Sequence, residues 1–145
     1  MRKIFLGIVG LLTACFILIQ FIPVERDHPL IRADLKVPPE VKAILKRSCY
    51  DCHSQETRWP WYSYVAPVSW MISDDVRKGR KHLNFTMWDQ YSDKKKEIVK
   101  DHIYEEVNGG TMPLPIYLTM HPEARFTEED IKILSKWLGK TLRSK

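Results

Sequence analysis

Hydrophobic and polar positions divide the chain into an apolar N-terminal segment and a longer amphipathic part. Residues 4–22 contain no charged side chain and only one strongly polar one, Gln20. At about 1.5 Å per residue, a helix over this segment reaches roughly 28 Å, close to the hydrocarbon thickness of a bilayer. Pro23 and the charged residues after it end the segment. The pattern predicts an N-terminal membrane anchor over residues 1–23.

The apolar segment also fits two other interpretations, a cleaved signal peptide and a lipoprotein leader with Cys15 as the lipidated residue. It is long for a signal peptide, and no Ala-x-Ala-like cleavage site follows it. It also stays apolar for seven residues after Cys15. We therefore expect an uncleaved, single-pass anchor. The charges of Arg2 and Lys3 favour a cytoplasmic N-terminus, although Arg26, Arg32 and Lys36 nearly balance them from the other side.

Two amphipathic helices are expected in the first half of the remaining chain, and no segment alternates as a strand does. The first spans residues 39–49, with prolines where a first turn tolerates them. The second spans residues 67–79, and we expect it to end near Gly79. Their apolar faces consist of Val41, Ile44, Leu45 and Ser48, and of Val68, Ile72 and Val76.

Two further helices are expected in the second half. One spans residues 93–107, with Ser92 as its N-cap and the glycines of residues 108–110 after its end. The last follows Thr127, which forms a capping-box pattern with Asp130. Their apolar faces consist of Val99, Ile103 and Val107, and of Ile131, Leu134, Leu138 and Leu142.

Residues 24–36 separate the anchor from these helices. They are charged, interrupted by proline and without sustained periodicity, which predicts a tether. Residues 37–145 then form one all-α domain. Its connections are long and irregular, as at residues 111–115, and such connections in a small domain usually wrap around something or carry function.

The composition is that of an ordinary globular protein, with 44% hydrophobic and 28% charged residues. The formal net charge is +5, and the Lys and Arg residues are scattered along the chain. A nucleic-acid-binding protein is expected to show a basic stripe with interleaved aromatic residues. We therefore expect no nucleic-acid partner.

Cys49, Cys52 and His53 form the sequence C-Y-D-C-H, which is the clearest chemical signal in the chain. Residues i and i+3 of a helical turn face the same side, so both thiols can face one rigid object. A porphyrin with two vinyl groups fits, because each thiol adds across one vinyl group while the imidazole binds the iron. The spacing therefore predicts the attachment of one covalent haem c. Such attachment places the domain outside the cytoplasm, in agreement with a cytoplasmic N-terminus.

Three other kinds of site also use paired cysteines. A structural zinc site needs four ligands, and the chain has neither a second C-x-x-C nor an H-x-x-x-H. A thioredoxin-like redox pair belongs to an α/β fold, of which no pattern is present. A plain disulfide between Cys49 and Cys52 is the third alternative. Each of these three sites explains fewer features of the sequence than covalent haem attachment does.

Met112 is the candidate for the second axial ligand of the iron. A thioether ligand raises the reduction potential of a haem. Gly109 and Gly110 before it, and Pro113 and Pro115 after it, give an irregular but stiff loop that can hold one side chain. An ordinary methionine in a surface loop is the alternative. Other ligand candidates are Met120, His121 and Met87, whereas Met71 is assigned to a helical core, His82 and His102 to ordinary positions and His28 to the tether.

An aromatic run follows the motif and consists of Trp59, Trp61, Tyr62, Tyr64 and Trp70. These side chains could line the haem and exclude water. A Trp, a Tyr or Arg58 could also hydrogen-bond a haem propionate. The alternative is that the aromatic side chains form the ordinary core.

The helix, the C-x-x-C-H motif, the Met-Pro loop and the capped C-terminal helix resemble class I cytochrome c. This resemblance implies terminal helices that pack across each other beside the haem, with His53 and Met112 as axial ligands. Residues 49–70, 82–85 and 109–127 also resemble the bacterial haem-binding domain family. This second resemblance covers about residues 37–142 and implies a small exported or membrane-anchored protein.

We therefore expect a membrane-anchored, mono-haem c-type cytochrome on the periplasmic or other extracytoplasmic side of the cytoplasmic membrane. It would carry electrons to or from an unidentified redox protein and would not be an enzyme. The alternative is a haem sensor or peroxidase-like enzyme with an open sixth iron position, where His82, His102 or His121 acts as an acid or base. A haem carrier or assembly subunit would show the same sequence features.

Overall fold

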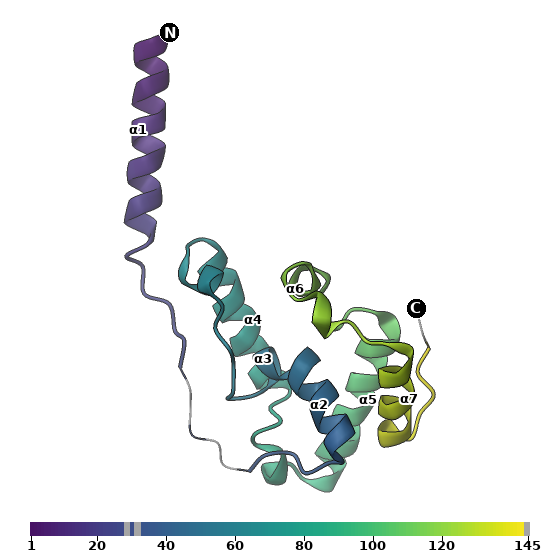
Figure 1. Ribbon diagram of the computed structural model, residues 1–145. Helices are drawn as coiled ribbons and strands as arrows, with labels where there is room; N and C mark the ends of the chain where they lie inside the picture. The colour runs from purple at the N-terminus through teal and green to yellow at the C-terminus, as the bar shows by residue number, and fades with distance from the viewer. Residues whose placement is uncertain (28–29, 31–32, 144–145) are drawn as a thin grey trace.

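The computed structural model describes residues 1–27, 30 and 33–143 (Figure 1). These residues form α-helices and short 3-10 helices (η) and contain no β-strand, which confirms the all-α prediction. His28 and Arg32, which the sequence assigns to the tether, lie outside the described residues. The elements are α1 (Arg2–Ile19), α2 (Pro39–Ser48), α3 (Tyr50–His53), η1 (Trp61–Tyr64), α4 (Val68–His82), η2 (Trp88–Gln90), α5 (Asp93–Gly109), α6 (Pro115–Met120), η3 (Pro122–Ala124) and α7 (Glu128–Leu138).

Helix α1 extends away from the other helices, and none of its residues is buried (Figure 1, purple). Its mean hydropathy is 2.1 over 18 residues. A helix of this length and composition next to the N-terminus fits either a membrane span or a signal sequence.

The core lies where α2, α5 and α7 meet, and α7 contacts both of the other helices (Figure 1). The predicted apolar face of α2 is buried here, as are Leu134 and Leu138 of α7, whereas Ile131 is partly buried. Val99 is the residue of the predicted α5 face that is buried in the core. Ile103 and Val107 of the same face are partly buried and pack against the core. Leu142 also packs into this core, although it lies beyond the end of α7. In α4, by contrast, only Val76 of the predicted face is buried, and Val68 is 41% exposed.

The packed domain includes residues 33–35 of the segment that the sequence interprets as a tether. Leu35 is only 5% exposed and belongs to the core. Its backbone N–H donates to the carbonyl of Phe85 at 2.9 Å, and that of Ala33 donates to the carbonyl of Thr86 at 3.1 Å. Ala33 and Leu35 therefore belong to the packed domain, although they precede residue 37.

Two helix boundaries differ from the sequence-based expectation. Helix α4 continues through Gly79 to His82. Helix α6, which the sequence pattern does not predict, begins at Pro115 directly after the Met112 loop. Proline is favoured in the first turn of a helix, because its missing N–H has no intrahelical partner there.

The predicted capping box at the start of α7 is present and also joins α7 to α2. The Thr127 hydroxyl accepts a hydrogen bond from the backbone N–H of Asp130, and the Asp130 carboxylate accepts one from the backbone N–H of Thr127 at 2.7 Å. The same carboxylate accepts a charged hydrogen bond from Arg47 of α2 at 2.5 Å. Burial favours a higher pKa for Asp130, but its bonds to Thr127 and Arg47 outweigh burial and hold the pKa below 3.8.

Replacing Asp130 by Asn is expected to lower the free energy of unfolding by about 1–3 kcal/mol at neutral pH, because charged hydrogen bonds are lost. A depressed folded-state pKa stabilises the fold above the ordinary pKa of 3.8, and this contribution disappears as the pH falls through the lower folded-state value. Chemical denaturation at neutral and acidic pH should show the difference from wild type shrinking below that pH. Glu128→Gln, an exposed change in the same turn, is the control, and an equal loss at both pH values would contradict the prediction.

Candidate functional site

The C-x-x-C-H motif occupies a short helical turn directly after α2. The backbone N–H of Cys49 still donates to Leu45 at 2.8 Å, and the N–H of His53 donates to Cys49 at 2.9 Å. Cys49 and Cys52 are both partly exposed free thiols, so the structure has no disulfide between them. The three motif side chains therefore project from one short helical turn.

The His53 ring is fixed by two backbone carbonyls of α4 and its C-cap. Its Nδ1 lies 3.0 Å from the Gly79 oxygen and 3.2 Å from the Leu83 oxygen. A carbonyl only accepts hydrogen bonds, so Nδ1 carries the proton and Nε2 keeps its lone pair. Burial lowers the pKa of His53, more than the two carbonyls raise it. The ring is therefore neutral and oriented, as a metal-binding histidine is, with Nε2 available as a ligand.

Gly79 allows α4 to approach the motif this closely. A Cβ atom at Gly79 would lie 2.6 Å from the carbonyl oxygen of Cys52 and 3.1 Å from its carbonyl carbon. Contacts below 3.0 Å require the backbone to shift. Gly79 therefore serves helix packing rather than helix termination, which is why α4 continues beyond it.

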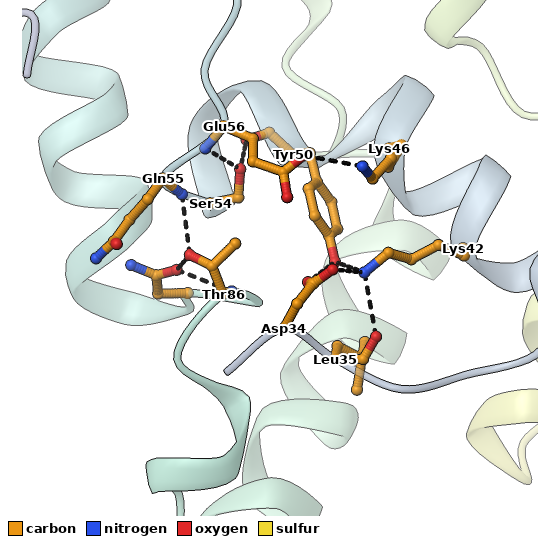
Figure 2. A network of polar contacts seen from close by, with 10 residues as sticks. Asp34, Leu35, Lys42, Lys46, Tyr50, Ser54, Gln55, Glu56 and Thr86 are labelled. Carbon is orange, nitrogen blue, oxygen red and sulfur yellow. Dashed lines mark hydrogen bonds and ion pairs between the residues drawn. The ribbon is translucent and has the colours of Figure 1, made fainter. Parts of the chain in front are cut away.

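Figure 2 shows how the first inner residue of the motif, Tyr50, is held in the core. Its hydroxyl donates to Asp34 at 2.7 Å and accepts from Lys42 at 2.5 Å. Lys42 also forms an ion pair with Asp34 and donates to the Leu35 carbonyl at 3.1 Å. The Tyr50 ring stacks on Phe85 with 5.1 Å between ring centres. These contacts fix the motif against the segment that precedes α2.

The chain leaving the motif is fixed as well (Figure 2). The Ser54 hydroxyl donates to the Tyr50 carbonyl at 2.7 Å and accepts from the backbone of Glu56 at 2.9 Å. The next residue, Gln55, donates its backbone N–H to the Thr86 hydroxyl at 3.0 Å. The His53 carbonyl accepts from the backbone of Phe85 at 2.8 Å. The turn is thus held from both sides before any cofactor is considered.

Asp51, the second inner residue of the motif, connects the motif to α6. Its carboxylate accepts from the backbone N–H and the guanidinium of Arg58, at 3.1 and 3.2 Å. It also accepts from the Tyr117 hydroxyl of α6 at 2.8 Å. Burial and the nearby Asp51 charge raise the pKa of Tyr117, so its hydroxyl remains a donor. Arg58 is therefore engaged with Asp51. Tyr117 is the second partner of Asp51, and no sequence pattern indicates this contact.

The loop with Met112 is held at both ends. At its start, the backbone N–H groups of Thr111 and Met112 donate to the Glu106 carbonyl of α5, at 3.0 and 3.3 Å. Gly110, with a φ of 72°, makes the turn out of α5. At its end the loop enters α6, which Tyr117 joins to the motif. Met112 itself is partly exposed.

The other ligand candidates are less suitably placed. Met120 is 54% exposed. His121 uses both ring nitrogens: Nε2 lies 2.6 Å from the Tyr62 hydroxyl, and Nδ1 lies 3.1 Å from Glu123. Met87 is partly buried, and His82 and His102 are exposed. Met71 is also 54% exposed, so its assignment to the helical core is wrong, because it lies on the side of α4 opposite Val76.

The aromatic run does not behave as one group. Trp61 and Tyr64 are 75% and 57% exposed, which excludes them from the core. Tyr62 contacts His121. Trp59 and Trp70 are partly buried, and their indole nitrogens have no hydrogen-bond partner among the described residues.

Within the described residues, the surroundings of the motif provide neither a group of metal ligands nor a lowered thiol pKa. Within residues 1–27, 30 and 33–143, no three His, Cys, Asp or Glu side chains are grouped so that they could hold a metal ion. Burial, above all, raises the pKa of both motif thiols to about 12. A redox-active thiol pair normally has a lowered pKa, because the thiolate is the nucleophile.

A comparison with protein families agrees with this geometry. A sequence model described as a haem-binding domain matches residues 14–140, which include the motif and the Met112 loop. No curated protein and no solved structure matches the chain. The family match covers most of the sequence and supports haem binding. The chain therefore belongs to the haem-binding domain family.

Proposed function

We propose that this protein is a membrane-anchored c-type cytochrome that carries electrons outside the cytoplasmic membrane. The setting of His53 carries the proposal: two carbonyls fix its Nδ1 and leave Nε2 for iron. Cys49 and Cys52 would hold one haem covalently through thioether bonds. The bound haem would supply an iron centre that accepts and returns one electron.

Met112 is proposed as the residue that would bind the haem iron together with His53. Its loop is fixed by α5 at one end and by the Tyr117–Asp51 contact at the other. Met120 is exposed, and His121 is engaged through both nitrogens. Two ligand segments that are both held by the protein would move little when the charge of the centre changes.

Electron transfer is favoured over peroxidase-like or sensor chemistry by the positions of the histidines. His82 and His102 are exposed on helices, and His121 already pairs with Tyr62 and Glu123. None of the three combines burial with an unengaged ring nitrogen, which is the setting we would expect for an acid or base acting on peroxide. Membrane anchoring is supported by α1, which is apolar and wholly unburied. The redox partner is a protein that remains to be identified.

The optical spectrum of the reduced protein, recorded with and without carbon monoxide, tests the proposal. The full chain would be made in cells that mature c-type cytochromes. We expect a haem spectrum that carbon monoxide leaves unchanged, because both axial positions are filled. A shift in the wild-type spectrum would contradict the Met112 assignment and favour the sensor or peroxidase function. Absence of haem would contradict the proposal altogether.

Replacing Met112 by Ala is expected to open the iron to carbon monoxide and to lower the reduction potential, since a thioether ligand raises it. The spectrum with carbon monoxide and a redox titration measure both effects. Met120→Ala, at an exposed methionine eight residues further on, is the matched control. An unchanged Met112→Ala spectrum would rule out Met112 as the ligand, and a shift in Met120→Ala would assign that role to Met120.

A further inference from the structure

The end of the apolar helix contacts the haem-binding domain directly. Gln20 follows α1, and its side-chain amide pairs with both backbone polar groups of Ala66. The amide oxygen accepts from the Ala66 N–H at 2.9 Å, and the amide nitrogen donates to the Ala66 carbonyl at 3.3 Å and to the Phe16 carbonyl at 2.9 Å. Ala66 is only 3% exposed. Gln20 thus joins α1 to the connection between η1 and α4.

A second contact lies a few residues further along the chain. Arg26 donates to the Ser63 carbonyl at 3.1 Å, and its guanidinium carbon lies 4.5 Å from the centre of the Tyr64 ring. This is within the range of a cation–π interaction. Two more contacts continue along α4, from Ser73 to the Glu25 carbonyl at 2.8 Å and from Arg80 to the Asp27 carboxylate at 2.7 Å. The segment after α1 therefore lies against η1 and α4.

The surface beside these contacts exposes two large aromatic side chains, Trp61 and Tyr64 of η1. Trp and Tyr are enriched at membrane–water interfaces, where an apolar ring and a polar group can both be accommodated. In Figure 1 the start of α4, which directly follows this segment, lies beside the C-terminal end of α1. The exposed rings and the end of α1 are therefore neighbours.

The length of α1 sets the depth of this surface in a membrane. Eighteen residues of helix span about 27 Å, against roughly 30 Å of hydrocarbon, so a membrane-spanning α1 would place Gln20 at the boundary of the apolar layer. An amide at that boundary needs hydrogen-bond partners, because leaving it unpaired is costly. Ala66 supplies two of them. Residues that neighbour Ala66 are thereby placed at the level of the lipid headgroups.

From these contacts we infer that the haem-binding domain rests on the bilayer surface through η1. Trp61 and Tyr64 insert into the headgroup region, and the Gln20–Ala66 and Arg26–Tyr64 contacts hold the domain in that orientation. The occupant of the exposed aromatic surface is the lipid that surrounds α1. This inference depends on the membrane anchoring proposed above, and it adds a fixed orientation of the domain to that proposal.

Depth measurements on the full haem-loaded chain in phosphatidylcholine nanodiscs test the inference. In a Cys15→Ala background, a spin label at Trp61→Cys would be compared with one at Lys94→Cys, an exposed position of α5. Collision rates with oxygen, which concentrates in lipid, and with a water-soluble nickel chelate report the depth of each label. We expect a higher oxygen-to-nickel ratio at position 61 than at position 94. Equal ratios would overturn the inference.

Two further outcomes separate this inference from the proposals on which it depends. Gln20→Leu combined with Arg26→Ala keeps α1 apolar but removes both contacts, and it should lower the ratio at position 61 towards that of position 94. An unchanged ratio would overturn the role given to Gln20 and Arg26. A chain that carries haem but does not co-purify with nanodiscs would contradict the anchor, and the surface contact with it.

Discussion

A chain that carries both Cys49→Ser and Cys52→Ser is expected to retain no haem after denaturation. Serine hydroxyls do not form the thioether bonds that the proposed attachment requires, so any haem that still binds through His53 is released when the fold is lost. Each single variant should keep one covalent bond. Denaturing gel electrophoresis with haem staining, and the mass of the intact chain, measure the loss directly.

Cys15→Ser is the matched control, because Cys15 lies in the exposed part of α1 and far from the motif in the sequence. Its haem content should equal that of wild type. Covalent haem in the double variant would show that attachment does not involve the motif. Loss of haem in Cys15→Ser would point to a defect in export or membrane insertion instead.

Replacing Gly79 by Ala is expected to destabilise the protein by about 1–3 kcal/mol, as overpacking of a close contact does. The sign is informative, because Ala inside a helix normally stabilises it by roughly 1 kcal/mol relative to Gly. Here the new Cβ would lie 2.6 Å from the Cys52 carbonyl oxygen. Neither atom can turn away by a side-chain rotation, so the backbone itself would have to move. Relief of that contact would also disturb the Gly79 carbonyl, which lies 3.0 Å from the Nδ1 of His53.

Urea unfolding of the full chain in detergent, followed by circular dichroism, measures the change in stability. Gly109→Ala is the matched control, since a Cβ there meets its nearest atom at an ordinary 3.8 Å. That variant should be close to wild type or slightly more stable. A stabilised Gly79→Ala would show that α4 and the motif have room between them, and it would weaken the argument for a fixed His53.

Features that depend on nearby residues could be predicted from the sequence. The capping box of Thr127 and Asp130 and the N-cap at Ser92 are each formed within a single helical turn. The C-x-x-C-H motif is also local, because its cysteines and histidine all lie within one short helical turn. The haem-binding family could be predicted for this reason, since its most specific signal is local.

Features that depend on distant residues could not be predicted. Gly79 resembles a helix end in sequence, and only the approach of Cys52 shows why a glycine is needed inside α4. Leu35 lies in a charged, proline-containing stretch, yet it pairs with Phe85 and enters the core. Tyr117 is a site residue only because it donates a hydrogen bond to Asp51, 66 residues earlier. In each case the local sequence pattern does not depend on the distant partner, so it cannot reveal that the contact exists.

The contacts at both ends of the segment between α1 and α2 limit how far the domain can travel from its anchor. Arg80 holds Asp27, and the backbone of Thr86 holds Ala33. Arg80 and Thr86 both belong to the domain, so only the eight residues after Ile19, up to Asp27, separate the end of α1 from it, and they span at most roughly 28 Å when fully extended. In a membrane-anchored protein, this arrangement provides no long flexible linker that would let the domain move far from the membrane. Under the proposed function, a redox partner would therefore have to meet this protein at the membrane surface, by lateral diffusion or by approach from the aqueous side.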